Sequence, residues 1–207
     1  WMTLAWPVAE PYPPPCIALL AGLAVAETVD SVLSQGSDTP ASAPLVKWPN
    51  DVLIGGAKVA GVLCETFMDR GAAFLLIGVG TNIRNELPIE IEGRRVTSLS
   101  KCGATLEPAA FIDQLCDRLT ARVHAAAETV SSGALAEVDR VAIESRLAHR
   151  GERVEVMAPG VVPVVGSILG LASDGSLLVK PEDGGGPALR VSSGEMRVVP
   201  LRSGATE

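Results

Sequence analysis

Two lysines, an asparagine and an aspartate gather in the stretch Leu45–Glu65, as Lys47, Asn50, Asp51 and Lys58. Ammonium groups bind carboxylates and phosphates, while amide and carboxylate groups orient a ligand or take up a proton. The combination therefore suits a site that holds an anion in fixed geometry. The residues alone also allow readings without a binding site. Lys58 would then be an exposed lysine after a turn, and Asp51 would be a turn cap after Asn50.

The elements around these four residues are predicted to be strands joined by tight turns. Val52–Ile54 is an apolar run, Gly55-Gly56 is a hairpin-turn dipeptide, and Lys58–Glu65 resumes a strand that is apolar on both faces. A third buried strand, Ala72–Val79, ends at Gly80-Thr81-Asn82. Glycine at a strand end lets the backbone approach a ligand closely, so this end is expected to lie near the site.

Helical periodicity predicts helices over Ile17–Leu33, Pro108–Val130 and Ala134–His149. Asn82–Arg95 is predicted to be a polar loop of mixed charge, because it has no helical period. Residues 1–15 are rich in proline, which excludes a helix there and argues against a central strand.

From Gly151 onward the pattern changes to short strands separated by turn residues, with Asp174-Gly175 as a strong hairpin signal. Five short strands in about fifty residues predict a small barrel. The predicted strands are Arg153–Met157, Pro163–Leu171, Ser176–Lys180, Ala188–Ser192 and Met196–Val199.

Composition narrows the class of protein. Hydrophobic residues make up 47% of the 207 residues and charged residues 20%, which is typical of a globular chain with a real core. A net charge of -7 argues against a nucleic-acid-binding surface. The four cysteines lack metal-ligand or CxxC spacing, and the longest apolar run, Cys16–Ala26, is too short to span a bilayer. We therefore expect reduced thiols and a cytoplasmic protein.

The chain resembles biotin protein ligases, which attach biotin to a lysine of a carrier protein. The resemblance covers nearly the whole chain and rests on matches in the same order as in the family. The matching segments are Lys47–Asp51 (Lys-Trp-Pro-Asn-Asp), Gly55–Leu63 (Gly-Gly-Ala-Lys-Val-Ala-Gly-Val-Leu), Gly78–Ile83, Val96–Leu99, Asp174–Leu178 and Ser193–Glu195.

The resemblance implies an α+β fold, in which a mixed β-sheet packed by helices, as in class II synthetase-like biotin/lipoate ligases, precedes a small SH3-like β-barrel. The expected domains are a catalytic domain at residues 1–150, incomplete at its N-terminus, and the barrel at residues 151–207. Trp1 is expected to be the tryptophan that follows the family's glycine- and arginine-rich biotin loop, which would then be missing. There is no N-terminal helix-turn-helix, so DNA binding is not expected.

The resemblance also implies a two-step reaction. ATP converts the biotin carboxylate into biotinyl-5'-AMP, and the carrier lysine then attacks this mixed anhydride. Fixed cations are the main catalytic need, because carboxylate and phosphate charge meet in one place. By resemblance Lys58 contacts the carboxylate and the α-phosphate, Lys47 supports the site, and Asp51 orients or deprotonates the incoming lysine.

Gly61 and Leu63 match positions whose backbone faces the biotin ring, although a packed strand explains them equally well. Four residues are expected to bind ATP: Trp1, Asn50, Lys58 and Asn82. Trp1 would stack on the adenine ring. The alternative for Asn82 is an ordinary turn residue in a loop. Mg²⁺ is expected with ATP, and its ligands are unknown.

The expected partners are a biotin carboxyl carrier protein or domain, biotin and ATP, without DNA or a membrane. Family members are often dimers, so a homodimer is a further expectation. Two other functions stay open. One is a lipoate or octanoate transferase, which shares the catalytic fold. The other is a non-catalytic remnant that binds carrier protein or nucleotide, because without the missing loop the adenylate would leak into water.

Overall fold

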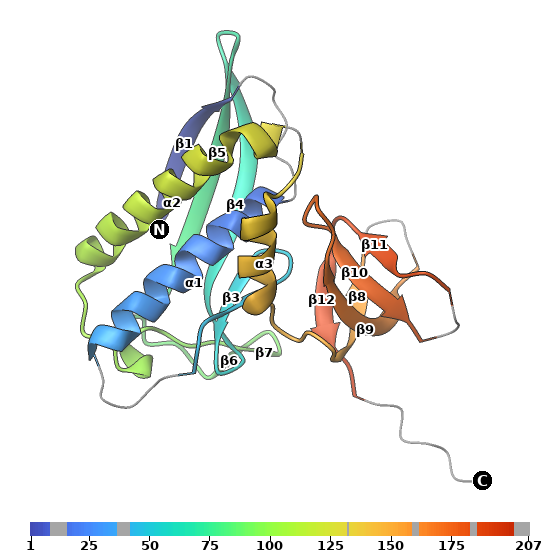
Figure 1. Ribbon diagram of the computed structural model, residues 1–207. Coiled ribbons are helices and arrows are strands. Elements are labelled where there is room, and N and C mark those ends of the chain that lie inside the picture. The colour runs from blue at the N-terminus through green and yellow to red at the C-terminus, as the bar shows by residue number, and fades with distance from the viewer. Residues whose placement is uncertain (9–15, 37–41, 132, 159–161, 183–185, 201–207) are drawn as a thin grey trace.

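A computed structural model describes residues 1–8, 16–36, 42–131, 133–158, 162–182 and 186–200. The larger part of the structure is a five-stranded sheet with helices packed on one face (Figure 1). Across this sheet the strands run in the order β1 (Met2–Val8), β5 (Ala72–Thr81), β4 (Ala57–Asp69), β3 (Asp51–Ile54) and β2 (Leu45–Lys47).

All ladders of this sheet are antiparallel, so the prediction of a mixed sheet was wrong in this respect. Each strand except β1 is joined to the next along the chain by a short connection, which only antiparallel neighbours allow. Among the described residues, parallel pairing is confined to two isolated bridges, Val46–Leu147 and Lys58–Val96. The strand β1 contains Pro7 and lies at an edge of the sheet, which agrees with the expectation that this proline-rich segment does not form a central strand. The rest of that segment, residues 9–15, lies outside the described ranges.

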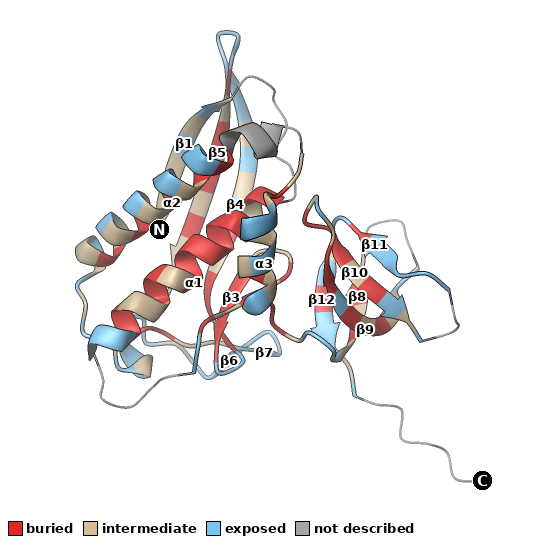
Figure 2. Ribbon diagram, in the orientation of Figure 1, coloured by how far each residue is buried: buried red, intermediate tan, exposed pale blue. Residues whose placement is uncertain are grey.

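The helix α1 (Cys16–Gly36) is the centre of the core, and its first two-thirds are almost entirely buried (Figure 2). It packs between the sheet and α2 (Pro108–Ser131), which explains why it is apolar on nearly all sides. By length and composition its segment Cys16–Gln35 would be able to cross a membrane, but 78% of the most apolar 18-residue window is buried inside the protein. The burial accounts for the apolar sequence.

The third helix is shorter than predicted, since α3 spans only Glu137–Ser145. The chain leaves the helix there because its backbone pairs with β2: Val46 N–H donates to the Arg146 carbonyl, and Ala148 N–H donates to the Val46 carbonyl, at 2.8 and 2.9 Å. His149 therefore lies in a turn with φ 62°, not in a helix.

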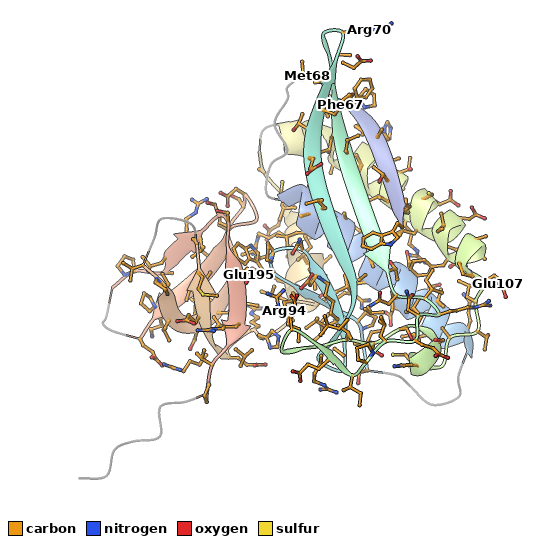
Figure 3. All side chains as sticks on the ribbon, turned by 180° about the vertical axis from the view of Figure 1, so that it is seen from behind. Phe67, Met68, Arg70, Arg94, Glu107 and Glu195 are labelled. Carbon is orange, nitrogen blue, oxygen red and sulfur yellow. The ribbon has the colours of Figure 1, made fainter. Side chains whose placement is uncertain are left out.

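Two further segments contain more β-strand than the sequence predicted. The hairpin of β4 and β5 pairs without interruption to Asp69 and Ala72, so it projects as a long ribbon whose tip carries Phe67, Met68 and Arg70 (Figure 3). The predicted loop over Asn82–Arg95 contains a small hairpin of β6 (Glu90–Ile91) and β7 (Arg94–Arg95), and a 3-10 turn follows at Ser100–Cys102.

The C-terminal strands form a second antiparallel sheet, close to the predicted boundaries. Its order is β11 (Leu189–Val191), β10 (Leu177–Pro181), β9 (Val164–Leu171), β8 (Arg153–Met157) and β12 (Glu195–Val198). Among the described residues β11 and β12 are its two edges and do not pair with each other, so the sheet is open as described. The fully buried Trp48 ties the two sheets together, because its Nε1–H donates to the Gly175 carbonyl at 3.2 Å.

Candidate functional site

The predicted turn at Gly55-Gly56 brings Lys58 back onto Asp51. Both glycines have positive φ, 55° and 76°, a conformation that fits a two-residue hairpin turn and that side chains disfavour. Lys58 Nζ lies 2.5 Å from Asp51 Oδ1. Asp51 is buried, whereas the Lys58 side chain keeps 36% of its surface exposed. The pair thus joins a fixed carboxylate to a cation that a ligand can reach.

Lys47 stands beside this pair, directly opposite Asp51 in the ladder between β2 and β3. It is half-buried, and its side chain makes no hydrogen bond or ion pair with any other residue of the described ranges. Burial is the main reason that the pKa of its ammonium is lowered; Asp51 opposes this shift, and Arg94 and Lys58 add to it. Within the described ranges Lys47 is therefore a cation without a direct ion pair, although the Asp51 and Glu195 carboxylates lie close enough to favour its charge.

A pocket of about 460 Å³, here named the tryptophan pocket, opens along the ends of β1, β4 and β5. Six of the predicted site residues line it: Trp1, Asn50, Lys58, Gly61, Leu63 and Asn82. Leu63 exposes 61% of its surface here, which excludes the alternative of a strand residue buried in the core.

Two glycines keep the tryptophan pocket open. A β-carbon at Gly61 would lie 3.1 Å from Lys58 Nζ, and one at Gly80 would collide with the Trp1 indole, which lies over that glycine. The sheet surface between Trp1 and Lys58 is thus bare backbone on which a flat group can rest.

The two asparagines are fixed by their amide groups. Asn50 Nδ2 donates to the Val62 carbonyl at 2.7 Å, and Asn82 Nδ2 donates to the Thr97 carbonyl at 3.1 Å. Their Oδ1 atoms accept no hydrogen bond within the described ranges and so are acceptors for a ligand. Thr81, on the same wall, has a buried hydroxyl without a hydrogen-bond partner among the described residues.

A second pocket of about 540 Å³, here named the arginine pocket, lies on the other side of the Lys58–Asp51 pair. It is enclosed by the hairpins β3–β4 and β6–β7 and by β8 and β12 of the C-terminal sheet. The charged residues and the histidine among those that line it are Lys47, Asp51, Lys58, Glu92, Arg94, Arg95, His149, Glu195 and Arg197.

An ion pair closes one side of the arginine pocket. Arg94 Nη2 lies 2.8 Å from Glu195 Oε1, so that a residue from the β6–β7 hairpin meets one from the start of β12 (Figure 3). This contact lowers the pKa of the Glu195 carboxyl and raises the pKa of the Arg94 guanidinium. The resemblance marks Glu195 as part of a family motif, and the structure adds its partner.

Every predicted site residue lines one of the two pockets, and Lys58 lines both. Of the two pockets, Lys47 and Asp51 line only the arginine pocket, although Asp51 Oδ1 would lie 3.5 Å from a β-carbon at Gly61 of the tryptophan pocket. Sequence reasoning missed Arg94, Arg95 and Arg197. A signal existed in Glu-Ile-Glu-Gly-Arg-Arg, where Glu-Gly between short polar runs is typical of a hairpin turn.

Residues 1–82 match the biotin/lipoate A/B protein ligase family. The chain is 31% identical over 186 residues to a biotin–[acetyl-CoA-carboxylase] ligase of Mycobacterium tuberculosis, covering 90% of this chain and 62% of that protein. A protein of the same name from Paracoccus denitrificans is 28% identical, with 73% and 60% covered. The chain thus spans about three fifths of the length of these curated relatives.

The fold is shared with biotin protein ligase from Aquifex aeolicus. The structure solved in complex with biotin and ATP superposes with a TM-score of 0.74 at 24% identity, covering 95% of this chain and 78% of that one. Residues 1–82 thus match the biotin/lipoate A/B protein ligase family, and the curated relatives and the solved structure that the chain resembles are named biotin ligases.

Proposed function

We propose that this chain carries the catalytic site of an ATP-dependent biotin ligase, which forms biotinyl-5'-AMP and transfers biotin to a lysine of a biotin carboxyl carrier protein. The observation that carries the proposal is the 2.5 Å pair of Lys58 and Asp51 where the tryptophan and arginine pockets meet. The names of the curated relatives support biotin as the acid and an acetyl-CoA carboxylase as the carrier.

In the first step a biotin carboxylate oxygen attacks the α-phosphorus of ATP, and the bond to pyrophosphate breaks. Both reactants are anions, so a fixed ammonium group lowers the barrier by stabilising charge as it develops. Lys58 is the group that meets this need. The bare backbone at Gly61 and the exposed Leu63 offer a surface for the biotin ring, while the Trp1 indole would stack on adenine beside Asn82 and Asn50.

In the second step the carrier lysine attacks the carboxyl carbon of the adenylate, and AMP leaves. The attacking amine must lose a proton, and a carboxylate close to the reacting carbon can accept it. Asp51 is suited to this role because it is buried and touches Lys58, which would also hold the acyl phosphate. Lys47, opposite Asp51, adds positive charge beside the reacting phosphate.

We propose that Mg²⁺ arrives with ATP, held by phosphate and water oxygens. The described residues offer no group of three or more His, Cys, Asp or Glu that could hold a metal ion by themselves. Trp1 to about residue 150 would be the catalytic domain, and the C-terminal sheet would be the counterpart of the family's SH3-like barrel. Free thiols in the described ranges agree with a cytoplasmic site of action.

The test is intact-mass analysis of a purified biotin carboxyl carrier domain after incubation with this chain, ATP and magnesium, in parallel with biotin, lipoate and octanoate. A single adduct with biotin, absent without ATP, is expected. An adduct with lipoate or octanoate in place of biotin would reassign the activity within the family. No adduct from folded protein with any acid would refute the ligase as proposed and favour a chain that binds without ligating.

A further inference from the structure

The turn Trp48–Asn50 joins β2 to β3 and thereby sets the relative placement of two residues of the proposed site. Lys47 and Asp51, on either side of the turn, lie directly opposite each other in the ladder. Turns usually run over the surface of a protein. Here the Trp48 side chain is only 1% exposed, so the turn is anchored in the interior by its largest residue.

Two hydrogen bonds hold this turn from opposite sides. Asn50 Nδ2–H donates to the Val62 carbonyl at 2.7 Å, which ties the turn to β4. Trp48 Nε1–H donates to the Gly175 carbonyl at 3.2 Å, which ties it to a turn of the C-terminal sheet, 127 residues further along the chain. Trp48 lines neither the tryptophan pocket nor the arginine pocket, so any effect on the reaction passes through its neighbours.

The Gly175 carbonyl is a fixed acceptor, because several contacts hold the turn between β9 and β10. Gly175 N–H donates to the Ala172 carbonyl at 3.0 Å. The Asp174 carboxylate accepts hydrogen bonds from the backbone N–H and the hydroxyl of Ser176, at 3.0 and 2.8 Å, and lies 2.8 Å from Arg190 Nη2. The C-terminal sheet therefore offers Trp48 a partner that is held independently of β2 and β3.

We infer that Trp48 is a positioning residue: through its hydrogen bond to Gly175, the C-terminal sheet holds Asp51 in the geometry that the transfer step needs. The inference rests on the proposed function. Proton transfer requires the carboxylate within hydrogen-bond reach of the attacking amine, so a small displacement of the turn slows this step. Biotin would lie on β4 and β5 at Gly61 and Leu63, outside the turn, so its binding should not depend on Trp48.

The test is Trp48→Phe, which keeps an aromatic ring in the interior and removes the N–H donor. Single-turnover kinetics from added biotinyl-5'-AMP measures transfer to a carrier domain, and biotin-dependent exchange of pyrophosphate into ATP measures adenylation. We expect transfer about tenfold slower, adenylation changed by less than about threefold, and an unchanged KM for biotin. A variant that is only less stable would lose both activities in proportion to its folded fraction, which circular dichroism measures.

Trp6→Phe is the matched control. It removes the same kind of donor from a half-buried tryptophan of β1, which lies against the His124 ring and outside both pockets. This variant should leave transfer unchanged.

Asp174→Ala tests the other side of the contact, because it loosens the turn that carries the Gly175 carbonyl. It should also slow transfer, and the double variant with Trp48→Phe should be no slower than Trp48→Phe alone, since both changes break the same connection. Additive losses would show that Trp48 does not act through this turn.

Transfer at the wild-type rate in folded Trp48→Phe would overturn the positioning role, as would equal losses of transfer and adenylation. A wild-type chain that neither exchanges pyrophosphate nor biotinylates the carrier would reject the proposed ligase and this role with it. The two failures are distinguishable, because the first leaves an active wild type and the second does not.

Discussion

The ion pair between Lys58 and Asp51 stands at the boundary of two pockets, and only its cation lines both of them. The carboxylate lines the arginine pocket alone. We propose different steps of the reaction for the two side chains: Lys58 for adenylation, where charge develops, and Asp51 for transfer, where a proton must leave the amine. Substitutions at the two positions should therefore separate the steps.

Lys58→Ala should slow biotin-dependent exchange of pyrophosphate into ATP by about 100-fold or more, the loss expected when a group that stabilises the transition-state charge is removed. The fold should survive, because Lys58 is partly exposed and lies next to a turn. Lys101→Ala is the matched control, since that lysine is exposed, lies outside both pockets, and its side chain donates, among the described residues, only to the Leu87 carbonyl. Exchange at the wild-type rate in Lys58→Ala would contradict the assignment.

Asp51→Asn should slow transfer to the carrier domain more than it slows adenylation. The amide keeps the shape of the carboxylate but cannot take a proton from the attacking amine. Single-turnover kinetics, started from ATP and biotin or from added biotinyl-5'-AMP, separates the two steps. An equal loss in both would show that Asp51 acts only by holding Lys58.

Gly175→Ala should destabilise the protein more than Gly71→Ala. Both glycines have positive φ, 82° and 86°, so each substitution carries a backbone cost of about 1 kcal/mol. A β-carbon at Gly175 would also lie 3.0 Å from Cys16 Cα, whereas nothing lies within 4 Å at Gly71. We expect an additional loss of about 1–3 kcal/mol at Gly175, measured by urea unfolding. Equal losses would mean that the C-terminal sheet does not pack against α1 through this turn.

Cys16 and Cys64 should resist alkylation in the folded protein at pH 9. Burial raises the pKa of each thiol to about 12, so about one in a thousand is ionised there, against about half of an ordinary thiol with a pKa of 9.0. Because the folded pKa is raised, these thiols favour folding below pH 9, and that contribution is lost between about pH 9 and pH 12. Peptide mapping after iodoacetamide treatment tests this; rapid labelling at pH 9 in native protein would refute it.

The positions of β3, β5 and the C-terminal strands were predictable because local signals fix them. Gly55-Gly56 and Asp174-Gly175 both set hairpins, and apolar runs between them define β3, β5 and the C-terminal strands. The site residues followed from one contiguous motif, whose members the hairpin necessarily brings together. The order of the strands and the assignment of Lys47 and Asp51 to a different pocket from Leu63 depend on long-range pairing that no local pattern contains.

Two features were missed for the same physical reason, which is a contact between residues that are distant in the sequence. The end of α3 was missed because a tertiary contact, the bridge between Val46 and Leu147, overrides the helical pattern that continues to His149. The arginine pocket was missed because Arg94 and Glu195 come from segments that are distant in the chain. In both places the decisive partner is close in space but distant in the sequence.

The most direct test of the account is detection of biotinyl-5'-AMP by mass spectrometry, in a mixture of this chain, biotin and MgATP without any carrier. We predict that the adenylate forms in wild type and Lys101→Ala, fails to form in Lys58→Ala, and is consumed when a carrier domain is added. Absence of the adenylate from folded wild-type protein that binds both biotin and ATP would contradict the central claim that the Lys58–Asp51 site activates the acid.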